Sequence, residues 1–212
     1  MKIIKAFMIL VIGISVISCD KIFRIGDDSW KDNGEGVRYS ISFCFTDNLG
    51  NCVSNGIALS NWSPENGTML QAKWGEVNRD SCKVFYSTPE NKNKKIFEQR
   101  FIMNKTEFGD WLLCSNIWGS LNNNYNPTIF QITCPYIFHD KDVHEFVVHW
   151  AVPQESITIN EGSGTSVLHF AKCIMLTVDG NEIDSTVYTR YPNSKQGELT
   201  NIVTIDTSLL GR

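Results

Sequence analysis

Two of the four histidines lie in one apolar run and bear on whether the chain could bind a metal ion. His144 and His149 both fall within Val143–Val152, a stretch with the alternation of a β-strand. Residues an odd number of positions apart in a strand point to opposite faces, so one metal ion cannot take both rings as ligands. We expect His144 on the apolar face with Phe146, and His149 on the opposite face with Glu145.

The other two histidines also have structural explanations. His139 precedes Asp140 and Asp142 in a stretch typical of a turn, where these side chains could hold a cation or simply face solvent. His169 lies between two apolar residues, as strand histidines that are hydrogen-bonded within the fold often do. We therefore predict no metal site and no cofactor.

Local motifs of the common catalytic centres do not occur in the sequence. The glycines around Ser163 lack the G-x-S-x-G spacing of a nucleophile elbow, and neither G-x-x-x-x-G-K nor H-E-x-x-H is found. The fold could still pair carboxylates for glycoside hydrolysis, because such pairs leave little local signature. The candidates are Glu76, Asp80, Glu98 and Glu145. We predict no catalytic residues, with a hydrolase acting on glycans as the less favoured alternative.

Aromatic residues beside turns are the remaining candidates for ligand binding. Trp62 precedes Ser-Pro, Tyr125 precedes Asn-Pro and Tyr191 precedes a proline. Rings in such loops stack on sugars or anchor protein interfaces, and they can equally close the ends of a hydrophobic core. We take these three residues as candidate ligand contacts.

The cysteines after residue 19 are even in number: Cys44, Cys52, Cys82, Cys114, Cys134 and Cys173. None has C-x-x-C spacing, which argues against thiol exchange and zinc-ribbon sites. An even number permits disulfides in an oxidising compartment, and buried thiols on strands are the alternative. Because Cys44 alternates with the apolar residues around it, we expect it near solvent or in a second packed layer. An exposed thiol oxidises, so we predict at least one disulfide at Cys44.

Residues 1–19 have the order of a secretory signal. Lys2 and Lys5 form a basic start, and Ala6–Ile17 is an apolar run too short to span a membrane, which takes about 20 such residues. The run closes with Val16-Ile17-Ser18-Cys19, which resembles the lipobox of bacterial lipoproteins with Val16 in place of the usual leucine. The resemblance implies that Cys19 is lipidated and becomes the first residue of a membrane-anchored mature chain.

The charge of the chain argues against nucleic acid as a partner. The sequence has 23 acidic and 19 basic residues, two of the latter in the leader, and a net charge of −4. Phosphate binding requires clustered Lys and Arg, whereas the nearest basic run, Lys92–Lys95, is typical of a solvated loop. The length after the leader, about 194 residues, is enough for one large domain with its own core.

Period-two alternation, with turn signals between the segments, predicts a mostly β fold. In Tyr39–Thr46 the odd-numbered residues are all apolar, as in a half-buried strand. The further predicted strands are Gly56–Asn61, Met69–Glu76, Cys82–Ser87, Lys95–Met103, Thr128–Cys134, Val143–Val152, Ser156–Ile159, Val167–Val178, Ile183–Thr189 and Asn201–Asp206. Helices do not alternate with these segments, so we predict a sandwich of antiparallel sheets rather than a parallel α/β fold.

One segment, Thr106–Ser120, departs from this alternation. Residues of one helical face recur there at steps of three and four: Phe108, Trp111, Leu112, Ser115 and Trp118. Thr106 is suited to cap the start of a helix, and Gly119 to end it. We predict one short amphipathic helix that packs its aromatic stripe on a sheet; a pair of aromatic strands is the alternative.

The lipobox, the Ser18–Lys21 junction and turns such as Asp47–Asn51 together resemble the small lipoproteins of Bacteroidetes. The resemblance implies an immunoglobulin-like or transthyretin-like β-sandwich, anchored by fatty acids such as palmitate in the outer membrane and facing the periplasm or the exterior. We expect a signal peptide over residues 1–18, a lipidated cysteine and flexible tether over 19–36, and one β-sandwich domain over 37–212.

Three functions remain open at this point. The anchor, the tether and the missing catalytic motifs favour a non-catalytic binding or interaction module of the cell envelope, with a glycan or an envelope protein as its partner. The alternative is a structural subunit of a pilus or surface assembly, which requires a removable or donated edge strand. Asn201–Asp206 is the candidate for that strand. A glycan hydrolase is the third possibility.

Overall fold

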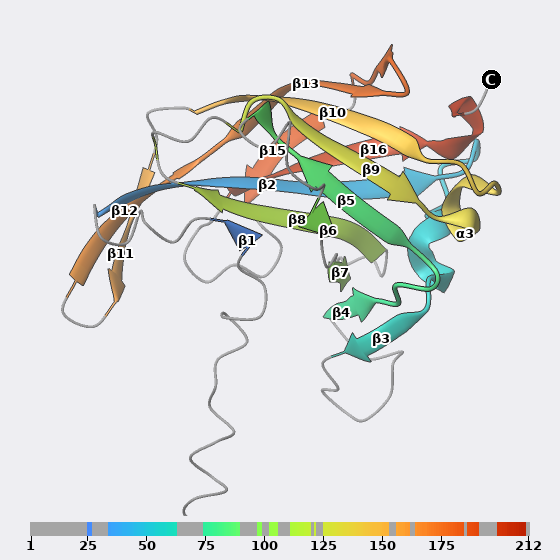
Figure 1. Ribbon diagram of the computed structural model, residues 1–212, viewed down its shortest axis with the longest axis horizontal. Helices are drawn as coiled ribbons and strands as arrows, with labels where there is room; N and C mark the ends of the chain where they lie inside the picture. The colour runs from blue at the N-terminus through green and yellow to red at the C-terminus, as the bar shows by residue number, and fades with distance from the viewer. Residues whose placement is uncertain are drawn as a thin grey trace, which may run out of the picture.

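The computed structural model describes residues 25–26, 34–62, 74–89, 97–98, 102–105, 111–119, 121, 125–152, 156–161, 164–184, 186–190 and 199–210. These residues form a mostly β structure of two sheets, the larger of which curls (Figure 1). The prediction of a mostly β chain is therefore confirmed. Among the residues described, one segment is α-helical, namely α3 (Pro135–Phe138).

The larger sheet is organised around one long strand. Its strands are β1 (Ile25–Gly26), β2 (Glu35–Thr46), β3 (Leu59–Trp62), β4 (Trp74–Val77), β7 (Ile102–Lys105), β8 (Trp111–Gly119), β11 (Ser156–Glu161), β12 (Gly164–Phe170), β15 (Thr186–Arg190) and β16 (Leu199–Asp206). The order is β11-β12-β2-β8-β7-β4-β3. On one edge, β2 pairs in parallel with β12 along its first half and with β16 along its second half. On its other edge, β2 pairs with β8 in the antiparallel sense.

The smaller sheet is antiparallel throughout its described pairs. Its strands are β5 (Lys83–Ser87), β6 (Phe97–Glu98), β9 (Thr128–Thr133), β10 (His144–Ala151), β13 (Lys172–Val178) and β14 (Asn181–Glu182), in the order β14-β13-β10-β9-β5-β6. Helix α3 connects β9 to β10. Two 3-10 turns, η2 (Val53–Gly56) and η5 (Thr207–Leu209), follow β2 and β16.

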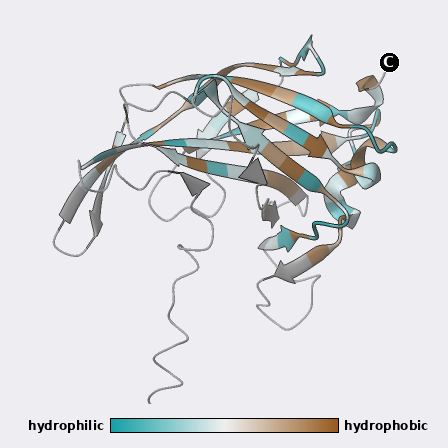
Figure 2. Cartoon of the chain, viewed as in Figure 1, coloured by the Kyte–Doolittle hydropathy of each residue, from teal (hydrophilic) through white to brown (hydrophobic). Residues whose placement is uncertain are grey.

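The core lies between the two sheets, where the alternation along β2 directs its apolar side chains. Phe43 and Phe45 are fully buried, as are Phe130 of β9 and Phe146 of β10. The ring centroids of Phe43 lie 5.9 Å from Phe130 and 5.2 Å from Phe146, within the range of favourable aromatic pairs. Hydrophobic and hydrophilic residues alternate along the strands of both sheets (Figure 2). The predicted inward face of Tyr39–Thr46 is confirmed.

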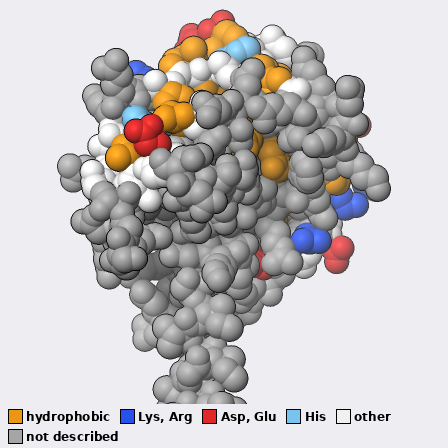
Figure 3. Space-filling model, turned by 60° about the vertical axis from the view of Figure 1, so that its left-hand side comes forward, with side chains coloured by type: hydrophobic (Ala, Val, Ile, Leu, Met, Phe, Trp, Pro, Cys, Tyr) orange, Lys and Arg blue, Asp and Glu red, His pale blue; other side chains and the backbone are white. Residues whose placement is uncertain are grey.

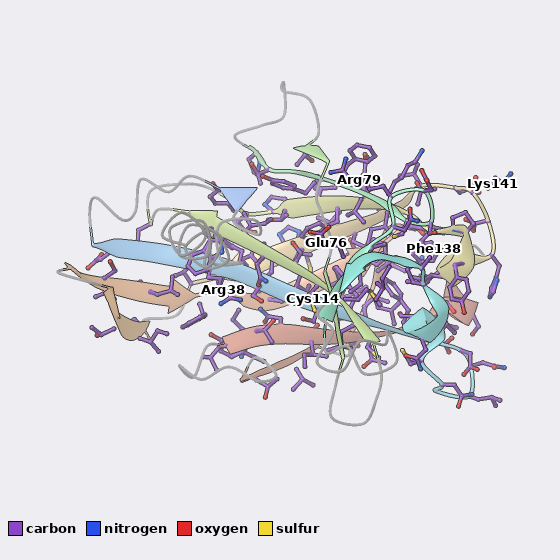
Figure 4. All side chains as sticks on the ribbon, turned by 90° about the horizontal axis from the view of Figure 1, so that it is seen from below. Arg38, Glu76, Arg79, Cys114, Phe138 and Lys141 are labelled. Atoms are coloured by element: carbon purple, nitrogen blue, oxygen red, sulfur yellow. The ribbon has the colours of Figure 1, made fainter. Side chains whose placement is uncertain are left out.

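The opposite face of β2 is buried too, so the expectation of a half-buried strand was wrong. Arg38, Ser40 and Ser42 are at most 6% exposed. Polar partners on neighbouring strands satisfy these side chains: the Ser40 and Thr200 hydroxyls are 2.7 Å apart, and the Ser42 hydroxyl donates to the Cys114 sulfur at 3.1 Å. Figure 4 labels Arg38 and Cys114 along this part of the sheet. A second buried layer is possible here because the side chains are small or hydrogen-bonded.

The chain passes from one sheet to the other at Ala171, between β12 and β13. The fully buried side-chain amide of Asn201 on β16 stabilises the backbone where the chain passes between the sheets. Its Nδ2 donates to the carbonyl oxygens of Ser40 and Ala171 at 2.8 and 2.9 Å, and its Oδ1 accepts from the Cys173 N–H at 2.8 Å. One side chain therefore satisfies backbone groups of both sheets. The predicted single strand Val167–Val178 is two strands for this reason.

Two further expectations need correction. The predicted helix in Thr106–Ser120 is wrong, because Trp111–Gly119 is strand β8, paired with β2 and with β7. Leu112, Leu113, Cys114 and Ser115 are all buried, and apolar residues occur on both faces of the strand, so the alternation is lost. The described part of this region is one strand, and the rest of the region, where the alternative of a strand pair would need its second strand, lies outside the described residues. The purely antiparallel architecture is also wrong, since β2 has two parallel partners.

The N-terminal expectations fall mostly outside the described residues. These include the signal peptide and Cys19. Within the segment 19–36 expected to be a tether, Ile25–Gly26 pairs in parallel with β8, and β2 begins at Glu35. No helix in the described part of the chain is long and apolar enough to cross a membrane.

Candidate functional site

His144, at the start of β10, is the histidine that the fold places in a polar site. His144 is 4% exposed, and its ring lies between two carboxylates. Nδ1 is 2.7 Å from Oδ2 of Asp179, and Nε2 is 3.2 Å from both carboxylate oxygens of Asp140. The Phe138 ring covers the imidazole, with centroids 4.1 Å apart. Figure 4 labels Phe138, the last residue of α3. We call Asp140, His144 and Asp179 the histidine–carboxylate site.

Two turns position the carboxylates of this site. Helix α3 ends at Phe138, His139 follows in a left-handed conformation with φ of 62°, and Asp140 comes directly after it. The Asp142 N–H donates to Asp140 Oδ1 at 3.0 Å, which fixes that carboxylate within its own turn. Asp179, with φ of 51°, begins the tight turn from β13 to β14. Its Oδ1 accepts from the Glu145 N–H at 2.8 Å, so Asp179 is bound to the strand that carries His144.

These contacts favour the charged form of His144. Burial of the ring works to lower its pKa, but the hydrogen bonds to Asp179 and Asp140, and the charges of both carboxylates, outweigh burial and raise the pKa of His144 above its ordinary value. With a carboxylate at each ring nitrogen, both nitrogens act as donors. The imidazolium then donates one hydrogen bond to each carboxylate, and these two bonds join the turn after α3 to the β13–β14 turn. We call this arrangement the clamp, and it depends on the proton that His144 carries.

The sequence identified parts of this site without joining them. His144 and His149 lie on opposite faces of β10, as predicted, because His144 is buried beside Phe146 while His149 is opposite Met175 on the outer face. Asp140 faces His144 rather than joining His139 in a cation site. The described residues hold no group of three or more His, Cys, Asp or Glu side chains arranged for a metal ion. Asp179 was not foreseen, because only the pairing of β10 with β13 brings it to His144.

The structure separates the three aromatic candidates. Tyr125 is 7% exposed, and its ring lies 5.1 Å from the ring of Tyr39 in the core. Tyr125 is therefore a core residue, and its prediction as a ligand contact is wrong. Trp62 ends β3, and its side chain lies outside the description; Tyr191 lies outside the described residues altogether.

The carboxylates considered for glycan hydrolysis are distributed over both sheets. Glu76 lies on β4 of the larger sheet, and Glu145 is exposed on β10 of the smaller one. Asp80 is exposed in the turn before β5, and Glu98 ends β6, with its side chain outside the description. The fold does not gather these four residues on one element or one turn.

The six cysteines after residue 19 are all thiols in the structure, including Cys44. The structure therefore shows no disulfide at Cys44, contrary to the prediction. On β16 the residue directly across from Cys44 is Thr204.

The outer face of the smaller sheet carries apolar side chains that remain partly exposed. Val147 is directly opposite Ile129, and His149 is directly opposite Met175. Ile174 is the extra residue of a bulge in β13 and is 61% exposed, while Met175 is 36% exposed. We call Ile129, Val147, His149, Ile174 and Met175 the outer strip. Figure 3 shows hydrophobic side chains on the surface of the described residues from one side.

Comparisons with known proteins add no family to this description. No protein-family model, no curated protein and no solved structure matches the chain.

Proposed function

We propose that this protein is a lipid-anchored module of the bacterial cell envelope that binds a protein partner through the outer strip of its smaller sheet. In this proposal Cys19 carries the lipid, and the folded residues form an immunoglobulin-like sandwich that presents the strip. The role is binding rather than catalysis.

The partly exposed outer strip is the observation that carries this proposal. Ile129, Val147 and Met175 lie on adjacent strands of one sheet and point away from the core. A sheet face in contact with water usually carries polar side chains, whereas contiguous exposed apolar residues mark interaction sites. His149 and the bulged Ile174 extend the same surface. Because the outer strip is part of a rigid sheet, a partner could bind it at little entropic cost to this protein.

The site chemistry is consistent with binding rather than catalysis. Both ring nitrogens of His144 are engaged by carboxylates, so the histidine–carboxylate site connects two turns of the fold. The N-terminal pattern supports the anchor, since a basic start, an apolar run and a cysteine in a lipobox-like context occur in the order of a lipoprotein signal.

The structure weakens the pilus alternative. A donated or removable strand is expected at the edge of a sheet, where one side of its backbone is unpaired. The candidate segment Asn201–Asp206 belongs to β16, which lies between β2 and β15 and is bonded to both. Removing it would break two strand pairings and the buried bonds of Asn201.

Capture of a partner from envelope extract tests the proposal. The intact protein would be crosslinked in membranes and purified, with Met175→Glu as the test variant and Leu49→Glu as the matched control. Leu49 is 81% exposed in the turn after β2, far along the chain from the outer strip. We expect the crosslinked partner to be lost in Met175→Glu and retained in Leu49→Glu. Equal capture by both variants would contradict the role of the strip. We expect the Cys19→Ala protein to lack the lipid. If this variant carried lipid to the same extent as the wild-type protein, the proposed anchor at Cys19 would be contradicted.

A further inference from the structure

We propose that Cys82 and Cys134 form a disulfide bond that covalently joins the start of β5 to the end of β9. The two residues lie one position beyond the described β5–β9 ladder, where Lys83 is opposite Thr133. Continuing that antiparallel register by one step places Cys82 directly opposite Cys134. This pairing is independent of the binding role proposed above.

The geometry of an antiparallel ladder meets the requirements of a disulfide. Residues directly across such a ladder have Cα atoms about 4.5–5.5 Å apart, and disulfides span Cα distances of about 4.4–6.8 Å. The two side chains also share a face. Val84 and Ile132 are a facing pair on the core side, and Cys82 and Cys134 each lie two positions from that pair, 5% and 0% exposed. Their Cβ atoms therefore point to the same side of the sheet.

The two sulfur atoms are already in contact. The Cys82 thiol donates a hydrogen bond to the Cys134 sulfur, and this bond together with burial raises the pKa of Cys82. The same bond, helped by the backbone N–H groups of Ile137 and Tyr136 at the start of α3, lowers the pKa of Cys134 despite its burial.

Formation of the bond requires a disulfide donor, for which oxidised glutathione or a protein disulfide is suitable. The thiolate of one of the two cysteines attacks one sulfur of the donor and releases one donor thiol, giving a mixed disulfide. The other cysteine then loses its proton and attacks the cysteine sulfur of this mixed disulfide, which releases the second donor thiol. Two cysteine thiols are oxidised and one donor disulfide is reduced to two thiols. Because both cysteines are buried in the folded chain, the exchange takes place before the core closes, and the finished bond is shielded from reductants.

The other cysteines provide an internal comparison. Cys173 on β13 is also buried, but the residue directly across from it is Trp150. Ser42 is directly across from Cys114 on β2. Thr204 is across from Cys44, and an isolated bridge places Thr46 across from Cys52. Among the described residues, Cys82 and Cys134 are thus the pair of cysteines that a ladder places opposite each other, and this pair encloses about 50 residues of chain. A loop of this length gives a large loss of unfolded-state entropy on closure.

Peptide mapping of the wild-type protein is the direct test. The intact protein would be unfolded and refolded with oxidised glutathione, alkylated without reduction, digested and analysed by mass spectrometry. We expect a Cys82–Cys134 linked peptide that disappears when reductant precedes alkylation. Recovery of both cysteines as separately alkylated peptides, or linked to other cysteines, would overturn the proposal.

Thermal unfolding provides the second test, with Cys173→Ala as the matched control. We expect the oxidised wild-type protein and oxidised Cys173→Ala to melt about 10 °C above their reduced forms. The Cys82→Ala/Cys134→Ala double variant should show no such difference. A wild-type melting temperature that does not depend on oxidation would refute the proposal, even if the double variant fails to fold.

Discussion

Replacing Asn201 with alanine should destabilise the fold far more than replacing an exposed asparagine with alanine does. The variant leaves three buried backbone groups without their partner: the carbonyl oxygens of Ser40 and Ala171 and the N–H of Cys173. An unsatisfied buried polar group costs about 1–3 kcal/mol, and carbonyl oxygens with a second lone pair lie at the lower end. The expected loss is about 4 kcal/mol in the free energy of unfolding, or about 8–16 °C in melting temperature for a chain of this size.

A matched control separates burial from the number of hydrogen bonds. Asn126 also bonds backbone groups through its amide, donating to the Trp150 carbonyl at 3.0 Å and accepting from the Trp150 N–H at 3.1 Å, but its residue is exposed. Water can replace an exposed amide, so Asn126→Ala should cost only about 1 kcal/mol. Urea unfolding of the purified protein in mild detergent, followed by tryptophan fluorescence, would measure both variants. Equal losses for Asn201→Ala and Asn126→Ala would refute the reasoning from burial.

Two further predictions concern the histidine–carboxylate site and a close contact in the core. Because the folded state raises the pKa of His144 above about 6.5, its contribution to stability is complete below pH 6.5 and is lost as pH rises through the folded-state pKa. Urea titrations across this pH range should therefore show stability falling with pH in the wild-type protein, and the fall should be smaller in His144→Gln; an identical profile in the two would refute the clamp. At Gly119, an added Cβ atom would clash with Cε2 of Tyr125, whose ring packs against Tyr39. Gly119→Ala should cost about 1–3 kcal/mol in thermal or urea unfolding, and a neutral result would show that the Tyr125 ring can move aside.

The sequence predicted those features of the fold that depend on short-range pattern. Alternation in β2 and β10 identified their inward faces, because each of these faces meets the core between the sheets. The same rule failed for β8, because its second buried face includes the apolar Leu112 and Cys114, whereas the second buried face of β2 carries polar side chains such as Ser40 and Ser42. Recurrence at three and four positions then resembled a helix although the backbone is extended.

The candidate site shows the same division between local and long-range information. The turn at Asp140 and the strand face of His144 could both be inferred locally. Asp179 could not, because its approach depends on which strand pairs with β10. Tyr125 was misassigned for a related reason: a ring beside a turn either faces solvent or closes the core, and only the packing of Tyr39 decides between these positions.

The parallel pairing of β16 with β2 also has a consequence for how the chain matures. The contacts that complete the larger sheet join residues about 160 positions apart, such as Ser40 and Thr200. Contacts of such long range form slowly, because the intervening chain must first be brought together. A chain emerging from the ribosome cannot build this sheet until β16 has been synthesised. Until then the second half of β2 is without its parallel partner, and the hydroxyl of Ser40 is without Thr200.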